Sequence, residues 1–448
     1  MKLVKFEIYK TDEKLISQGG LALVGRLLEK TNLRERIDGV EIAGRPRPEI
    51  KHGDVILSML GLLCMGKSDF EDIEGFRNDE FFRLSLGLEE LPSAATLRQR
   101  LDELAKKEEV CKIIREENLV LLKKNAPQIT GCLDDKVALD IDVTPFDNSG
   151  TKKEGVSCTY KKVEGYAPIF AYAGEEGYLV NCNLREGKQH SQNGTPEFLR
   201  DGIRAVWEIS GRKPLVRMDS GFDDKENIQV CEEERADYVI KRNLRKESQE
   251  EWLTYARNNG ELSEPRKGKE VYVGRRMMES EERSCEVVFE VTVRTMTPEG
   301  QKMLISEVEV ETFWTNLKVS PQDVVELYHQ HGTSEQFHSE IKSDLDMERL
   351  PSGKFATNSL MLLLGMVAYN ILRLVDQMGL IKNKKLPMGQ CAPIEKNLKR
   401  RRLRSVIQDI MYIACRLVRH ARRWAINLWC KNPWSVLWEH LYVQLCAG

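Results

Sequence analysis

The sequence predicts an α/β fold: a mixed β-sheet with helices on both faces, a β-rich insertion, an N-terminal helical domain and a C-terminal helical region. Two observations support this. From residue 137 onward, the apolar residues change from helical spacing to alternation with a period of two. The segments that follow come in the order strand, strand, strand, helix, strand, helix, strand. That order is typical of a mixed sheet whose later strands are joined by crossover helices.

Composition indicates a soluble protein, and the distribution of charge indicates a local basic surface. The chain has 448 residues, 41% hydrophobic and 31% charged, which describes a soluble protein with more than one core. The net charge of -2 carries no information about partners. Its distribution does, because the stretch from Lys396 to Arg423 holds ten Lys or Arg against one acid, Asp409. A nucleic-acid-binding protein needs only such a local basic surface.

The eleven cysteines are scattered and none forms a C-x-x-C pair, so we expect neither a zinc ribbon nor a redox motif. Residues 1–5 lack the apolar core of a signal peptide. The most apolar run, residues 360–375, is short for a membrane span and carries Asn370 and Arg373, which predicts a buried helix. We therefore expect a cytoplasmic protein with reduced thiols and no membrane partner.

Residues 1–130 are predicted to be a helical DNA-binding region. Apolar residues recur at helical spacing over 21–37, 55–65 and 93–104. The last of these helices places leucines on one side and Arg98 and Arg100 on the others. A helix that displays two arginines can read DNA in a helix-turn-helix manner. The alternative is a solvated helix face.

Residues 131–244 are predicted to form the first part of the α/β core. Strands are expected at 137–144, 166–173, 178–184, 214–218 and 238–241, with a turn at 174–177 and helices at 195–209 and 223–235. Asp142 lies on the first strand, and Asp219 follows the fourth. The carboxyl ends of strands are where α/β sheets place their sites.

Residues 245–318 are predicted to be a β-rich insertion, because 269–273, 285–294 and 303–316 alternate and are β-branched. Residues 319–378 complete the core. They open with Ser320-Pro321, a helix-start signal. Residues 379–448 are predicted to be a basic C-terminal helical region with one long helix over 398–428. Its Arg402, Arg404 and Arg419 are the expected contacts to the DNA backbone.

Four polar residues, Tyr328, His331, Glu335 and Lys342, are spaced so that they lie near one face of a helix. Gly332 weakens that helix. Thr333 can restart it as a cap, with Gln336 closing a capping box.

Two-metal phosphoryl transfer needs carboxylates that converge on divalent cations, and oxygen ligands suit Mg²⁺ or Mn²⁺. Asp142, Asp219 and Glu335 are the predicted catalytic and metal-binding set, with two ions per active site. Asp140 is the rival of Asp142, because both project from the same face of the first strand. Asp142 is favoured because Thr144 follows it two places later.

The spacing Tyr328, His331, Glu335, Lys342 and the stretches 140–144 and 217–222 resemble bacterial insertion-sequence transposases of the DDE type. The resemblance is to the group with a Tyr-x2-Arg-x3-Glu-x6-Lys signature and a β-rich insertion. It implies an RNase H-like core that binds the terminal inverted repeats of an element, hydrolyses its DNA ends and joins the freed 3′-hydroxyls to target DNA. It implies a homodimer in the synaptic complex, no cofactor beyond Mg²⁺ or Mn²⁺, and Tyr328 and Lys342 as phosphate contacts.

One position departs from that signature, because His331 stands where the group has arginine. An imidazole cannot fork onto a phosphate, and it is charged at neutral pH only if an acid raises its pKa. We expect His331 to make a weaker phosphate contact, with Glu335 keeping it charged. Two other functions stay open: a DNA-binding protein without catalysis, and a metal-dependent nuclease that does not join DNA.

Overall fold

The computed structural model describes residues 5–10, 12–42, 48–125, 127–279, 284–395 and 397–447. Residues 1–4 and Lys396, used in the predictions above, lie outside them. The chain folds as two compact units. One comprises Ala105–Asn370, and the other combines Met1–Leu104 with Ile371–Gly448.

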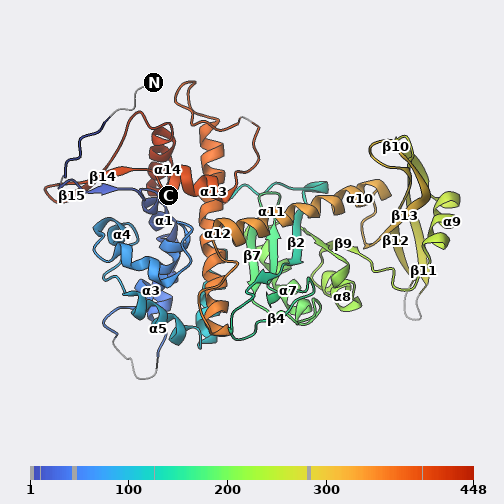
Figure 1. Ribbon diagram of the computed structural model, residues 1–448, viewed down its shortest axis with the longest axis horizontal. Helices are drawn as coiled ribbons and strands as arrows, with labels where there is room; N and C mark the ends of the chain where they lie inside the picture. The colour runs from blue at the N-terminus through green and yellow to red at the C-terminus, as the bar shows by residue number, and fades with distance from the viewer. Residues whose placement is uncertain are drawn as a thin grey trace. The chain divides into compact units, whose positions relative to one another are not determined.

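The unit Ala105–Asn370 is built on a nine-stranded mixed sheet (Figure 1). Its strands run in the order β10-β11-β12-β13-β9-β8-β2-β6-β7. Strand β2 pairs antiparallel with β6 and parallel with β8, and β8 is parallel to β9. The predicted mixed sheet is therefore confirmed. The strands are β2 (Val137–Val143), β6 (Ile169–Ala173), β7 (Tyr178–Asn183), β8 (Pro214–Met218), β9 (Asp237–Lys241), β10 (Glu261–Arg266), β11 (Lys269–Glu279), β12 (Ser284–Met296) and β13 (Lys302–Thr315).

Helices cover both faces of the five core strands. On one face, Gly202 of α7 lies beside Leu139 and Ala171. The opposite face carries Asp140 and Asp142 of β2, the next residues along a strand whose side chains alternate. The helices of this unit are α6 (Glu108–Asn125), α7 (Thr195–Ser210), α8 (Lys225–Glu233), α9 (Gln249–Asn259), α10 (Pro321–His329), α11 (Ser334–Ser339) and α12 (Phe355–Asn383), which continues into the other unit. Shorter turns are η2 (Leu133–Asp135), η3 (Ser220–Phe222), η4 (Gln330–Thr333) and η5 (Glu340–Asp344), and a small sheet joins β3 (Phe146–Asp147), β5 (Glu164–Tyr166) and β4 (Ser157–Cys158).

The hairpin between β6 and β7 has the predicted turn. Gly174 and Gly177 both have φ of 72°, a backbone conformation that glycine adopts without strain. The ring of Phe337 lies directly over Gly177, where a side chain would collide with it. On β7, the backbone N–H and C=O of Leu179 both bond to the amide of Asn370, at 2.9 and 2.7 Å. Asn370, the polar residue in the apolar run of α12, thus hydrogen-bonds backbone groups of the edge strand β7.

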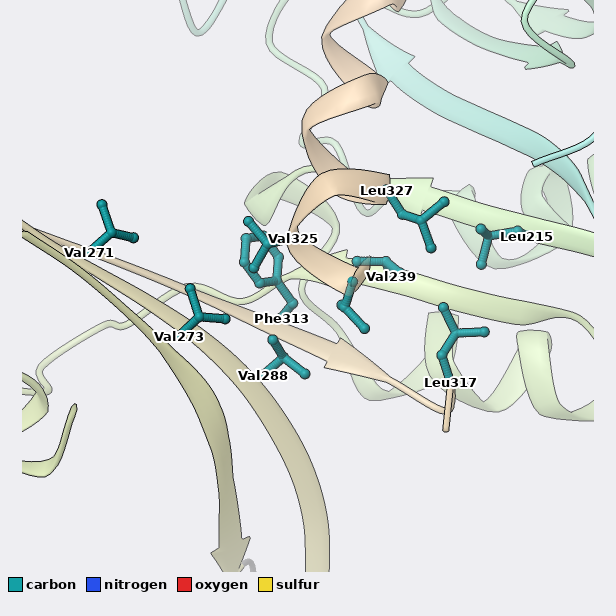
Figure 2. Packing of buried hydrophobic residues seen from close by; sticks show 10 residues of the cluster. Leu215, Val239, Val271, Val273, Val288, Phe313, Leu317, Val325 and Leu327 are labelled. Atoms are coloured by element: carbon teal, nitrogen blue, oxygen red, sulfur yellow. The ribbon is translucent and has the colours of Figure 1, made fainter. Parts of the chain in front are cut away.

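The β-rich insertion extends the core sheet rather than forming a sheet of its own. Strands β10 to β13 form an antiparallel meander, and Phe313–Thr315 of β13 pair with β9. Helix α9 and strand β10 were not predicted. Figure 2 shows how α10 packs against the sheet: Val325 lies beside Phe313 of β13, and Leu327 faces Leu215 of β8. Burying each such side chain contributes about 1.5–3 kcal/mol to stability. These contacts therefore hold α10 against the sheet.

The second unit combines helices with a three-stranded sheet of order β1-β14-β15. Its elements are β1 (Leu15–Ile16), α1 (Leu21–Leu28), α2 (Leu33–Asp38), α3 (His52–Leu63), η1 (Phe70–Phe76), α4 (Glu80–Ser85), α5 (Ala94–Leu104), α13 (Leu403–Val406), η6 (Ile407–Met411), β14 (Cys415–His420), β15 (Arg423–Leu428) and α14 (Ser435–Ala447).

The prediction of one long helix over 398–428 is wrong. Within 398–428, helical structure ends at Met411, and β14 and β15 form a hairpin. The reason is a change of period: Ile413, Cys415 and Leu417 are buried at every second residue, which only a strand allows.

Among the described residues, α12 is long and apolar enough to cross a membrane by length and composition alone. Of its most apolar window, 83% is buried within the protein, as in a core helix. Arg373 and Asp376, both fully buried within it, pair at 3.0 Å. The predicted buried helix is confirmed.

Candidate active site

Two aspartates lie at the same edge of the core sheet. Asp142 is on β2, and Asp219 directly follows the parallel strand β8 and accepts a hydrogen bond from the backbone N–H of Gly221 at 2.9 Å. Burial and the negative charge of Asp142 raise the pKa of Asp219. The two carboxylates are therefore close enough to repel each other.

Glu335 lies on α11 and its side chain is exposed. Glu335 and the two aspartates are all within electrostatic reach of Tyr160. The Tyr160 hydroxyl donates to the carbonyl of Val143 at 3.1 Å. Desolvation of that hydroxyl, together with the charges of Asp142, Asp219 and Glu335, raises the pKa of Tyr160 to about 12. The charges of all three predicted acids therefore act on one phenol.

Asp140 is occupied within the protein. Its two oxygens accept hydrogen bonds from Nε and Nη2 of Arg217, both at 2.7 Å, and Oδ1 also contacts Nδ1 of His331 at 2.8 Å. Burial disfavours its charge, but the guanidinium of Arg217 and the bond to His331 outweigh burial and lower the pKa of Asp140. Asp142 is partly exposed, with 21% of its side chain accessible, whereas Asp140 is buried.

The predicted phosphate contact of His331 is contradicted by its placement. The side chain is 6% exposed and is held by Asp140, so it reaches no DNA backbone. The physical reason is that α10 packs against the sheet in an orientation that turns His331 toward β2. Its pKa is raised: burial lowers it, but the hydrogen bond and the charge of Asp140 more than compensate. The acid that favours the charged form of His331 is therefore Asp140 and not, as the sequence suggested, Glu335.

The helix that carries the signature is continuous in direction but not in type. A 3-10 turn, η4, links α10 to α11, and a π-helical turn, η5, follows. Ser320 caps α10 as predicted, accepting from the N–H of Asp323. The predicted capping box does not form, because the Thr333 hydroxyl bonds to the carbonyl of Gln330 at 2.8 Å.

Tyr328 and Lys342 lie on either side of Glu335 in the chain and near the aspartates. Burial and the charges of Asp219, Glu311 and Asp142 raise the pKa of Tyr328. Burial and the charge of Lys161 lower the pKa of Lys342, while the charge of Glu348 and then that of Asp142 oppose this. Both side chains are thus within electrostatic reach of Asp142.

His338 and Glu340, which follow Glu335 in the chain, are 4% and 2% exposed. Nε2 of His338 lies 3.1 Å from Oδ2 of Asp142. Sequence reasoning missed this contact, although the spacing signals it: His338 lies three residues after Glu335 and seven after His331, on the same side of a helix.

The predicted DNA contacts of the other unit differ in exposure. Arg98 is 51% exposed and pairs with Glu71 at 2.9 Å. Arg100 is buried and donates to Nδ1 of His52, so its predicted DNA contact is contradicted. The spacing accounts for this, because position 100 shares the apolar helix face of Leu97 and Leu104.

The three predicted contacts of the C-terminal region are exposed. Arg402 precedes α13, and Arg404 lies within it. Arg419 is on β14, where it is paired across the hairpin with Trp424 and stacks on its ring at 5.3 Å. The hairpin also exposes Arg422 and Arg423.

Three carboxylates suit Mg²⁺ or Mn²⁺, and the repulsion between Asp142 and Asp219 is the charge pattern that a divalent cation relieves. Within the described residues, the group of three donors whose atoms all lie within 4.8 Å of one another is a different one: Glu290, Glu311 and His329. Lys241 already neutralises Glu311 there.

The model of the family described as transposase DDE domain group 1 matches residues 4–447. No curated protein matches the chain. Among solved structures, a similar chain comes from "Cryo-EM structure of piggyBac transposase synaptic complex with hairpin DNA (SNHP)". The two chains are 12% identical with a TM-score of 0.43, and the alignment covers 89% of this chain and 80% of that one. Because the family model spans nearly the whole chain, from the N-terminal helices through the three acids to the last helix, the protein belongs to the DDE-domain transposases of group 1.

Proposed function

We propose that the protein is the transposase of a bacterial insertion sequence and that Asp142, Asp219 and Glu335 hold two divalent cations for DNA cleavage and joining. Two observations support this proposal: Asp142 and Asp219 lie at the ends of neighbouring parallel strands, and the charges of all three carboxylates act on Tyr160. The cations, when bound, would activate the attacking oxygen and stabilise the leaving one. Mg²⁺ or Mn²⁺ is the expected cofactor.

The chain's own residues supply the rest of the site. Tyr328 and Lys342 bind phosphates beside the scissile bond, a phenol as hydrogen-bond donor and an amine as a point charge. His331, held by Asp140, fixes the turn that leads to Glu335. We assign the basic hairpin β14–β15, with Arg419, and the exposed Arg98 to DNA-backbone contacts outside the acid cluster.

The DNA partners are the terminal inverted repeats of the element and its target. Joining two ends at once implies a homodimer on DNA, acting in the bacterial cytoplasm at the nucleoid. Residues 1–130 and 379–448 would serve as DNA-binding regions around a catalytic core formed by 131–244 and 319–378 with the insertion 245–318.

The test is strand cleavage by the purified protein on DNA that carries the inverted repeats flanking its gene, with Mg²⁺ or Mn²⁺. Asp142→Asn, Asp219→Asn and Glu335→Gln should each abolish cleavage while DNA affinity stays within a few-fold. The matched control is Asp224→Asn, since Asp224 caps α8. Binding without cleavage by the unmodified protein would favour a non-catalytic DNA-binding protein. Cleavage without insertion into an added plasmid would favour a nuclease.

A further inference from the structure

The side chain of His338 lies between Asp142 and a buried tyrosine of the neighbouring strand. Nε2 is 3.1 Å from Oδ2 of Asp142, and Nδ1 is 3.2 Å from the hydroxyl of Tyr172. The imidazole packs against Phe170 and Tyr172, with ring centroids 5.4 Å away in both cases. Because it is 4% exposed and engaged through both nitrogens, the ring has one orientation.

These two contacts define where the ring proton sits. An ionised carboxylate only accepts, so Nε2 donates to Asp142. The Tyr172 side chain is buried, and its hydroxyl hydrogen needs an acceptor, which Nδ1 of His338 provides. A neutral imidazole protonated on Nε2 satisfies both bonds at once. The chain of donors therefore runs from Tyr172 through His338 to Asp142.

The carboxylate of Asp142 is held at both oxygens. Oδ1 accepts from the backbone N–H of Val143 at 2.7 Å, and Oδ2 accepts from His338. One donor on each oxygen fixes the rotation of the carboxylate and leaves each oxygen a lone pair for a cation. Without His338, only the bond to Val143 would restrain that rotation.

The same contact sets the distance between two of the acids. His338 lies on α11 three residues after Glu335, so its bond to Asp142 ties that helix to β2. At the other end of the segment, His331 ties η4 to Asp140 of the same strand. Glu335 lies between these two points of attachment.

We propose that His338 is a positioning residue that orients the Asp142 carboxylate for cation binding, with Tyr172 fixing its tautomer. This inference rests on the proposed function, which makes Asp142 a cation ligand. Partners that orient a metal ligand through a hydrogen bond typically change metal affinity or activity by about 10- to 100-fold when removed.

The test is a Mn²⁺ titration of the full-length protein followed by electron paramagnetic resonance, together with the Mg²⁺ concentration that gives half-maximal cleavage. His338→Ala should weaken Mn²⁺ binding about 10- to 100-fold. His338→Gln should stay within a few-fold of the unmodified protein, because the amide nitrogen of glutamine can replace Nε2. Tyr172→Phe should weaken binding in the unmodified background and change nothing in the His338→Gln background.

Thermal unfolding separates this effect from misfolding, with His440→Ala of α14 as the matched histidine control. Equal loss in the Gln and Ala variants, or unchanged Mn²⁺ affinity in the Ala variant, overturns the inference. The Asp142→Asn variant distinguishes failure of the inference about His338 from failure of the proposed function. If Asp142→Asn keeps both Mn²⁺ affinity and cleavage, the proposed function is wrong. If that variant loses both and His338→Ala loses neither, only this inference is wrong.

Discussion

His331 and Asp140 are joined by a 2.8 Å contact inside the protein, although they are 191 residues apart in the chain. Arg217 of the neighbouring parallel strand β8 holds the same carboxylate, so the three side chains form a buried ionic cluster. An arginine at position 331 would bring a second guanidinium beside Arg217. The histidine therefore suits a site where the carboxylate already has an arginine partner.

Asp140→Asn should lower the free energy of unfolding by about 3–5 kcal/mol, because it leaves the buried charge of Arg217 without its partner. Urea denaturation measures this. Asp134→Asn is the matched control: its side chain is 72% exposed, and its ion pair with Lys136 should contribute no more than about 1 kcal/mol. Equal effects of the two substitutions would contradict a structural role for Asp140.

The stability supplied by His331 should depend on pH. Its pKa in the folded protein is raised above the ordinary value of 6.5. The stabilisation is therefore complete below that value and is lost as the pH rises through the folded-state pKa. Unfolding free energies measured from about pH 5 to about pH 9 should fall more steeply for the unmodified protein than for His331→Gln. Parallel curves would show that His331 titrates alike in both states.

Divalent cations should stabilise the folded protein. Asp142 repels Asp219 in the metal-free site, and bound cations remove that repulsion. At a concentration 100 times the dissociation constant, binding adds about 2.7 kcal/mol to the free energy of unfolding. Differential scanning calorimetry with Mg²⁺ and with chelator measures this. Asp219→Asn should lose the increment while the metal-free protein stays as stable or becomes more so, and an unchanged increment would place the cations elsewhere.

The two arginines of α5 should behave oppositely. Arg100→Ala should cost about 1.5–3 kcal/mol of stability, because it removes buried hydrogen bonds of a charged group to His52. Arg98→Ala should cost less than about 1 kcal/mol, since Arg98 pairs with Glu71 at the surface, and should weaken DNA binding instead. Denaturation and fluorescence anisotropy on the same samples compare both variants. A DNA-binding defect of a fully folded Arg100→Ala protein would contradict this assignment.

The basic hairpin should bind DNA through phosphates alone. Arg419→Ala should weaken binding to all DNA sequences alike and reduce the slope of log affinity against log salt by about one. Lys112→Ala on α6, 75% exposed, is the matched control. Loss of discrimination between terminal-repeat and random DNA would instead indicate contacts to base edges.

The order of the core elements could be read from the sequence, because alternation, turn glycines and residue spacing are local properties. Asp142, Asp219 and Glu335 were predicted as the acid set from their places on two strands and a helix, with Asp140 as the rival of Asp142. The spacing of Arg100 from Leu97 and Leu104 also indicates a buried position. The charge of Arg100 led instead to the prediction that it is exposed to DNA.

Asp140 and Asp142 could not be distinguished from the sequence, because both point to the same face of β2 and differ in what packs against them. Arg217 and His331 reach the first, and His338 reaches the second. Only the tertiary structure decided the hairpin at 415–428, since its basic residues are compatible with a helix and its short apolar alternation became decisive only when β1 offered a strand to pair with. Contacts between residues almost 200 positions apart have no local signal, and they are what distinguishes the buried Asp140 from the partly exposed Asp142.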